Sequence, residues 1–325
     1  MYYKIRNERE GEKVVKRFLA GSIRLGKKKI TKTQLTLLLL VLPFMAFWVM
    51  FYYAQLFGWL YAFVDYNPGK PLWEMDWQGL RHFKKMFSPN SGFDVAFRNT
   101  LIYGVIGVVS SPLPAIFAIC LTEIRSVKLQ KTVQVLSSFP NFISWVLVYS
   151  LCFIMFSTEG QMTRLFLRMG LMENAQSILS NEDAAYLFQT VLSIWKGLGW
   201  GAILYLSSIA SIDQELLDAA AVDGAGRFQR IMNVTVPAML PTFFTLLIMN
   251  IANMFRTGFE QYYMFYNTMV SDKLDVIATY VYRRGLGNGD ISYAVAVGMI
   301  QSLISLVLLF AANKAAKKAT GTSFM

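Results

Sequence analysis

The chain has 325 residues, of which 55% are hydrophobic and 16% are charged, and its formal net charge is +11. A soluble globular chain carries about 25% charged residues, so this composition excludes an ordinary soluble protein. The hydrophobic residues gather into runs that each have about the 20 residues a helix needs to cross a ~30 Å hydrocarbon layer. The runs cover residues 35–63, 99–122, 133–156, 186–210, 236–258 and 291–313. Short segments of alternating hydrophobicity, typical of a membrane barrel, are absent. We therefore expect an all-α integral membrane protein with six transmembrane helices.

A basic tail, residues 1–33, precedes the first run and holds eleven Lys and Arg residues against three Glu. It is not followed by a small-residue cleavage site, so we do not interpret the first run as a signal peptide. A second basic tail, residues 314–325, contains three lysines and no acid. Lys and Arg accumulate on the cytoplasmic side of membrane spans, so we expect both termini in the cytoplasm and a transmembrane domain over residues 34–313. Anionic membrane lipids suffice to explain the basic tails, and we expect no nucleic-acid partner.

The residue types that carry catalysis or bind metals are scarce in this sequence. Cys120 and Cys152 both lie within apolar runs, and we interpret them as small buried hydrophobic residues. The single histidine, His82, has no Cys or His at ligand spacing, so no metal site is predicted. The chain has no Gly-x-x-x-x-Gly-Lys-Ser/Thr loop to hold ATP phosphates and no cluster of nucleophile and base. We predict no catalytic residue.

The first loop between runs contains a segment, residues 77–87, with the pattern of an amphipathic helix. Leu80, Phe83 and Phe87 fall on one face and three basic residues on another. Such a segment is typical of a helix that lies on a membrane surface.

The loop between the fourth and fifth runs, residues 211–234, is the most informative part of the chain. Ser211 is followed three residues later by Gln214, a capping-box pattern that predicts the start of a helix. Gly224 is expected to end that helix, because glycine enters the left-handed conformation without steric cost. A second short helix is expected over residues 227–232. Two short helices joined by a glycine form an elbow, and its small alanines allow a partner to approach closely. An ordinary surface helix–turn–helix is the plainer alternative.

This elbow resembles the EAA loop of the binding-protein-dependent ABC importer permeases. That family has the pattern Glu-Ala-Ala-x-x-x-Gly and, further on, an apolar residue followed by Pro. Here Asp218-Ala219-Ala220, Gly224 and Val236-Pro237 stand at these places, with aspartate in the position of the family's longer glutamate. The resemblance implies that the elbow inserts into a cleft of a cytoplasmic ATPase and transmits its opening and closing. The residues implied in ATPase coupling are Glu215, Asp218, Ala219, Ala220, Asp223, Gly224, Arg227 and Pro237.

Other segments are similar to the polysaccharide and complex-oligosaccharide branch of the maltose-type permeases. They are residues 62–69, 79–83, 98–100, 258–261, 275–276, 279–283, 292–294 and 296–298. The resemblance implies a type I ABC importer permease fold in a bacterial cell membrane, without a cofactor in this chain. It also implies a second related permease, two ATPase subunits that bind ATP and Mg²⁺, and an extracellular or periplasmic solute-binding protein. The carbohydrate cargo rests on this resemblance alone, since the 15% aromatic content also fits interfacial belts.

Polar groups inside the apolar runs are costly, so each is a candidate for the substrate pathway. Lys196, in the outer part of the fourth run, either lines the pathway or extends its amine toward the membrane surface. Asn250, Asn253 and Arg256 recur at three-residue spacing and are expected to share one face of the fifth span, where they line the pathway or bond to neighbouring helices. The candidate pathway residues are Asn141, Ser144, Trp145, Trp195, Lys196, Asn250, Asn253, Arg256, Glu260 and Tyr262.

Two other kinds of transporter fit part of the sequence. An ion-coupled carrier or a self-sufficient channel fits the composition, but it gives the elbow no purpose, and the runs show no inverted symmetry. An ABC permease for a non-sugar solute such as a polyol fits the elbow equally well.

Overall fold

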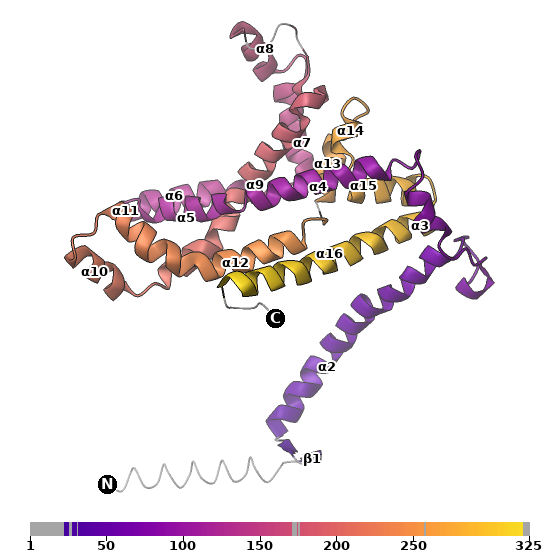
Figure 1. Ribbon diagram of the computed structural model, residues 1–325, viewed down its shortest axis with the longest axis horizontal. Coiled ribbons are helices and arrows are strands. Elements are labelled where there is room, and N and C mark those ends of the chain that lie inside the picture. The colour runs from indigo at the N-terminus through magenta and orange to yellow at the C-terminus, as the bar shows by residue number, and fades with distance from the viewer. Residues whose placement is uncertain are drawn as a thin grey trace. The chain divides into compact units, whose positions relative to one another are not determined.

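The computed structural model in Figure 1 describes residues 23–25, 28–30, 32–170, 174, 176–256 and 258–320. It divides into two compact units, residues 1–60 and residues 61–325. Most of the predicted basic tail, and residues 321–325 of the second tail, lie outside the described residues. Apart from one short hairpin, the described elements are helices.

The first unit consists of a hairpin and one long apolar helix. Strands β1 (Ile23–Leu25) and β2 (Lys28–Ile30) pair antiparallel, with Ile23 opposite Ile30. Helix α2 (Lys32–Tyr53) follows and leads into the 3₁₀ segment η1 (Ala54–Phe63), which crosses the boundary between the units. Every described side chain of α2 is exposed within its unit although most are apolar. A helix that is apolar all round needs lipid or another protein surface around it.

The second unit is built almost entirely from helices. Its longer helices are α4 (Phe93–Val109), α5 (Pro112–Thr122), α6 (Val127–Ser138), α7 (Trp145–Phe156), α9 (Glu182–Ala210), α12 (Val236–Ala252) and α16 (Ile291–Thr320). Its shorter helices are α3 (Arg81–Met86), α8 (Gln161–Arg168), α10 (Gln214–Val222), α11 (Arg227–Arg230), α13 (Phe259–Phe265), α14 (Ser271–Leu274) and α15 (Ile277–Tyr282). Short 3₁₀ or π segments are η2 (Leu72–Glu74), η3 (Phe139–Phe142), η4 (Ile178–Ser180), η5 (Ile231–Thr235) and η6 (Arg283–Gly287).

By length and composition, the described residues contain four helices that can cross a membrane. They are Thr36–Phe63, Phe93–Thr122, Arg227–Ala252 and Ile291–Lys318. A fifth candidate is the pair Val127–Phe142 and Trp145–Arg168, bent by 97°. The third predicted run, 133–156, is therefore broken instead of straight, and α7 and α8 leave the direction of α6 (Figure 1). The structure thus supplies four to five candidate spans where six were predicted.

Helix α9 contains the fourth predicted run and is 29 residues long, but it is not among the helices that are apolar enough to count as candidate spans. It packs against α4, α5, α6 and α12. Its buried residues are small or polar as well as aromatic: Ala185, Gln189, Gly199, Ala202 and Tyr205. Helix faces that pack on other helices can carry small and polar residues, whereas lipid-facing ones cannot. The central position of α9 therefore explains its mixed composition.

The segment predicted as a surface helix, residues 77–87, is helical only over α3. Leu80 and Phe87 are exposed, whereas His82 and Met86 are buried and α3 packs against α16. Of the three residues predicted to form an apolar face, Leu80 and Phe87 are exposed, and Phe83 packs against the core. Packing against the core selects a different face of this short helix.

Candidate functional site

The elbow predicted between the fourth and fifth runs is present, but α10 begins later than the capping-box pattern indicated. Asp213, and not Ser211, is the N-cap: its Oδ1 accepts a hydrogen bond from the Glu215 amide at 3.0 Å. The Ser211 hydroxyl instead donates to the carbonyl of Ser208 at 2.7 Å, in the last turn of α9. Aspartate and serine are both strong N-cap residues, but the negative charge of aspartate also interacts favourably with the positive end of the helix dipole. Asp213 therefore takes the N-cap position.

The glycine at the far end of α10 behaves as predicted. Gly224 has a φ of +79°. Its amide donates to the carbonyl of Ala221 at 3.1 Å, and the amide of Ala225 donates to the carbonyl of Ala220 at 3.0 Å. These two bonds form a Schellman motif, which ends a helix and turns the chain. The elbow is therefore a defined corner.

The second helix of the elbow is not a separate element. Helix α11 runs through the π turn η5 into α12, so that Arg227–Ala252 forms one helix. Pro237 is the second residue of α12 and interrupts no helix. Proline removes a backbone donor and crowds the carbonyl of the preceding turn. The wider π turn directly before it accommodates that crowding.

The elbow also carries exposed apolar side chains that the sequence interpretation missed. Val222 is 88% exposed, Phe228 74% and Leu216 58%. Asp218 accepts a hydrogen bond from the Gln214 side chain at 3.2 Å, and Gly226 donates its amide to the side chain of Gln229 at 2.8 Å. Of the predicted coupling residues, Ala220 is half-buried, while the others are exposed: Glu215, Asp218, Ala219, Asp223, Gly224, Arg227 and Pro237. The elbow thus presents both apolar and acidic groups to a partner.

Lys196 lies at the midpoint of α9, deeper than the outer part of the run where it was expected. Its Nζ donates to the backbone carbonyls of Pro140 at 3.1 Å, Asn141 at 2.9 Å and Ile143 at 2.5 Å. It also lies 5.3 Å from the centroid of the Trp145 ring. These carbonyls belong to the break between α6 and α7, where the Pro140 carbonyl also accepts the Ile143 amide at 3.2 Å. A cation near the C-terminal end of a helix interacts favourably with the negative end of the helix dipole, and it satisfies the free carbonyls there.

The break itself also positions two predicted residues. Asn141 is part of η3, and Ser144 caps α7 by accepting the Leu147 amide at 3.4 Å. Lys196, Asn141, Ser144 and Trp145 therefore gather at one place, the junction of α9 with the break.

The predicted face of the fifth span is not helical throughout. Helix α12 ends at Ala252, and Asn253 and Arg256 lie in the turn that follows. The Asn253 side chain donates to the carbonyl of Met249 at 2.8 Å, which caps the end of α12. Asn250 and Arg256 therefore do not share a helical face. Tyr262 is buried, with its ring 4.5 Å from that of Tyr103.

The remaining predicted pathway residues lie at the surface of the unit. Asn250, Trp195 and Glu260 are exposed. Phe142 and Trp200, which the sequence interpretation did not single out, are 70% and 51% exposed and meet edge to face at 5.6 Å beside the break.

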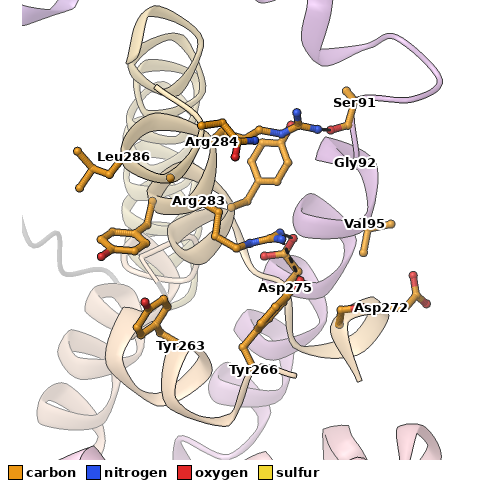
Figure 2. A pocket seen from close by; sticks show the side chains of 15 residues that line it. Ser91, Gly92, Val95, Tyr263, Tyr266, Asp272, Asp275, Arg283, Arg284 and Leu286 are labelled. Carbon is orange, nitrogen blue, oxygen red and sulfur yellow. Dashed lines mark hydrogen bonds and ion pairs between the residues drawn. The ribbon is translucent and has the colours of Figure 1, made fainter. Parts of the chain in front are cut away.

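A cavity of about 980 Å³ lies between the start of α4 and the segment from α13 to η6 (Figure 2). Its lining is Ser91, Gly92, Val95, Tyr263, Tyr266, Ser271, Asp272, Asp275, Tyr280, Tyr282, Arg283, Arg284, Leu286, Gly287 and Asn288. Asp275 pairs with Arg283, which also donates to the Tyr266 hydroxyl at 2.9 Å. Burial raises the pKa of Asp275, while Arg283 and the Thr279 hydroxyl oppose that shift. No sequence pattern indicated this cavity, because its walls come from two distant segments.

Buried hydrogen bonds hold the cavity's walls together. The Asn99 side chain, which is fully buried, donates to the carbonyls of Asp272 and Asp275, both at 2.9 Å. The Tyr280 hydroxyl donates to the Ser91 carbonyl at 2.7 Å. The Thr100 hydroxyl accepts the Ile277 amide at 2.8 Å. Polar side chains that bond between helices fix their register in a membrane protein, so the cavity is pre-formed.

Within the described residues, no group of three or more His, Cys, Asp or Glu is arranged to hold a metal ion. Cys120 and Cys152 are both free. Cys152 is buried as predicted, whereas Cys120, on α5, is exposed. The apolar runs predicted that both cysteines lie in hydrophobic segments, but they did not predict which of the two side chains is buried.

Residues 110–320 match the family described as "Binding-protein-dependent transport system inner membrane component". The chain is 37% identical to Protein LplB of Bacillus subtilis (strain 168), covering 87% of this chain and 88% of that protein. It is 33% identical to the polygalacturonan/rhamnogalacturonan transport system permease protein YteP of the same organism, covering 88% of each. Among solved structures, it is similar to a chain of a bacterial ABC transporter involved in the import of the acidic polysaccharide alginate. That match has a TM-score of 0.80 and 30% identity, and it covers 89% of this chain and 97% of the other.

Proposed function

The chain belongs to the family of binding-protein-dependent transport system inner membrane components, and we propose that it imports an oligosaccharide or polysaccharide. It is the permease subunit of an ABC importer, a multi-pass inner-membrane protein and not the ATPase. The carbohydrate cargo is supported by YteP, named for polygalacturonan and rhamnogalacturonan, and by the alginate transporter. These relatives favour a sugar chain over the alternative cargo, a polyol.

The complex in which it works contains a periplasmic solute-binding protein and ABC transporter subunits. A similar solved transporter, which the chain matches with a TM-score of 0.80, is described in complex with an alginate pentasaccharide-bound periplasmic protein. We infer a second related permease and two ATPase subunits that bind ATP and Mg²⁺, because one elbow docks one ATPase. No nucleic acid is needed, since membrane lipids account for the basic tails.

We infer a type I arrangement with six spans and both termini in the cytoplasm. Helix α9 is then the fourth span, and the bent pair of α6 and α7 is the third. The excess of Lys and Arg in the two tails supports this orientation. It places the elbow in the cytoplasm and the cavity of Figure 2 on the outer side.

The observation that carries the function is the elbow. Gly224 turns the chain sharply after α10, and the exposed Val222 and Phe228 lie on either side of it. Exposed apolar groups around small residues suit insertion into a cleft of another protein. Because α11 continues without a break into α12, a push on the elbow acts directly on a membrane-spanning helix. This continuity is a route by which ATP-driven movement reaches the substrate pathway.

The pathway is proposed at the broken third span. Discontinuous helices are the usual place where transporters present backbone groups and side chains to a substrate. Phe142 and Trp200 offer aromatic faces to sugar rings, and Trp195 is exposed one residue before Lys196 on α9. Asn250 and Glu260 are exposed as well and stay candidates for the pathway. Lys196, which bonds the carbonyls of the break, supports the shape of this region.

Replacing Gly224 by valine tests the coupling role. A β-branched residue is strongly disfavoured at a φ of +79°, although no atom lies within 4 Å of an added Cβ. We expect the variant to insert in the membrane with its partners while ATP-driven oligosaccharide uptake falls at least about tenfold relative to ATP hydrolysis. Gly226→Ala is the matched control, because its φ of −66° suits any residue and its Cβ meets only the Gln229 side chain at 3.8 Å. Normal uptake by Gly224→Val would refute the coupling role.

A further inference from the structure

The lining of the cavity in Figure 2 contains two carboxylates, Asp272 and Asp275, and two arginines, Arg283 and Arg284. Its two carboxylates each have an arginine partner: Asp275 pairs with Arg283, and Asp272 pairs with Arg98 at 3.0 Å. The next carboxylate along the chain, Asp290, pairs with Lys85. Both carboxylates of the lining are therefore already paired with an arginine.

Arg284 is the cation that remains. Among the residues that the structure describes, its guanidinium donates to the Ser91 carbonyl at 2.6 Å and lies 5.4 Å from the centroid of the Tyr280 ring. It forms no ion pair with a carboxylate of the described chain. An arginine fork that is held by a carbonyl and a ring keeps N–H donors for a planar anion, and a carboxylate matches that fork best.

The rest of the lining is suited to a sugar. Tyr263 and Tyr282 are exposed and form one aromatic cluster with Phe259, with ring centroids 4.9–5.1 Å apart. Aromatic faces pack on the apolar side of sugar rings, while hydroxyl and amide groups such as those of Ser271 and Asn288 bond to sugar hydroxyls. A volume of about 980 Å³ is at the upper end of the range of about 300–1,000 Å³ for small-ligand sites.

We propose that this cavity is an entry subsite for an acidic oligosaccharide, in which Arg284 binds the carboxylate of a uronic acid unit and the tyrosines contact its rings. This inference rests on the proposed transport of carbohydrate and adds the chemical class of the cargo. The subsite lies on the outer side, where the sugar passes from the solute-binding protein to the membrane pathway. It selects acidic chains before the conformational change.

The test is direct binding to the purified complex in nanodiscs without the solute-binding protein. The probes are trigalacturonic acid and its neutral counterpart, a galactose trisaccharide with the same linkage. The wild type is expected to bind the acidic trimer more tightly, and Arg284→Gln to lower that affinity about tenfold while leaving the neutral trimer unchanged. Arg81→Gln is the matched control: it makes the same charge change at an exposed arginine that bonds only Gln78 and does not line the cavity.

A second variant tests the same cavity in case Arg284→Gln does not fold. Leu286 lines the cavity and is 72% exposed, so Leu286→Trp adds bulk without removing a packed side chain. It is expected to weaken binding of both trimers. Unchanged binding in both variants, or equal loss of the two sugars in Arg284→Gln, overturns the proposal. Normal sugar binding with weakened association of the solute-binding protein also overturns it, because the cavity is then a protein docking site.

Uptake by the wild type separates the two proposals. If the wild-type complex imports a carbohydrate with ATP but Arg284→Gln behaves as wild type with acidic cargo, only the subsite is wrong. If the wild type imports no carbohydrate, the proposed function itself fails.

Discussion

Lys196 shows how a single charged residue is accommodated at the centre of a membrane protein. The sequence marks it as costly in an apolar run, and two roles are open: lining the pathway or reaching the membrane surface. The structure supplies a third role, because the ammonium group donates to three carbonyls at the break after Pro140, of which the Pro140 carbonyl also accepts the backbone amide of Ile143. Such carbonyls cost several kcal/mol each when they face hydrocarbon unsatisfied. The lysine and the break stabilise each other.

Lys196→Met separates this structural role from a role in the pathway. The substitution keeps most of the side-chain volume and removes a charged hydrogen-bond donor, which is worth about 1.5–3 kcal/mol. We expect a clearly lower melting temperature of the purified complex together with reduced uptake. Lys128→Met, at an exposed lysine on α6, should leave the melting temperature unchanged. Wild-type stability with abolished uptake would instead assign Lys196 to the pathway.

At the scale of elements, α9 and the end of α6 approach each other closely at Gly199. A Cβ added to Gly199 would lie 2.2 Å from the backbone carbon of Ser137 and 2.5 Å from the amide nitrogen of Ser138. Backbone atoms cannot move aside as a flexible side chain does. Small residues at such contacts let membrane helices pack closely. Gly199 therefore sets the distance between α9 and the broken third span.

Gly199→Ala is expected to be strongly destabilising. Overpacking of a tight contact costs about 1–3 kcal/mol, and here the obstacle is backbone. Two residues earlier on the same helix, Gly197 has nothing within 4 Å of an added Cβ. Gly197→Ala is the matched control and should be neutral or stabilising by about 0.5–1 kcal/mol, because alanine loses less conformational freedom than glycine in a helix. Thermal unfolding of the two variants side by side measures the difference. Equal melting temperatures would contradict the assigned contact.

The elements also show what sequence can and cannot predict here. Gly224 was identified correctly because the requirement for a left-handed residue is local. The N-cap was misplaced by two residues because Ser211 and Asp213 compete and only their hydrogen bonds decide. The run 133–156 was predicted as one span because it is long enough to cross the membrane, although Pro140 lies inside it. The cavity around Arg284 depends on segments about 190 residues apart, which no local pattern connects.

At the scale of the whole molecule, the number of spans depends on whether α9 crosses the membrane. Composition excludes α9 from the candidate spans, since it carries Lys196 and several glycines among its apolar residues. Helix α9 packs against α4, α5, α6 and α12, and this packing explains its composition. The composition is therefore compatible with a helix that crosses the membrane. If α9 crosses, the loops before and after it lie on opposite sides. That consequence can be measured.

Single cysteines in a background without Cys120 and Cys152 report the side of each loop. The positions are Glu159, Val222 and Gly287, which are all exposed in the structure. With six spans, a membrane-impermeant maleimide added to intact cells labels Glu159→Cys and Gly287→Cys, while Val222→Cys is labelled only after the membrane is opened. Labelling of both Glu159→Cys and Val222→Cys in intact cells would mean that α9 does not cross. The elbow would then face away from any cytoplasmic ATPase, so the same experiment tests the coupling mechanism at its base.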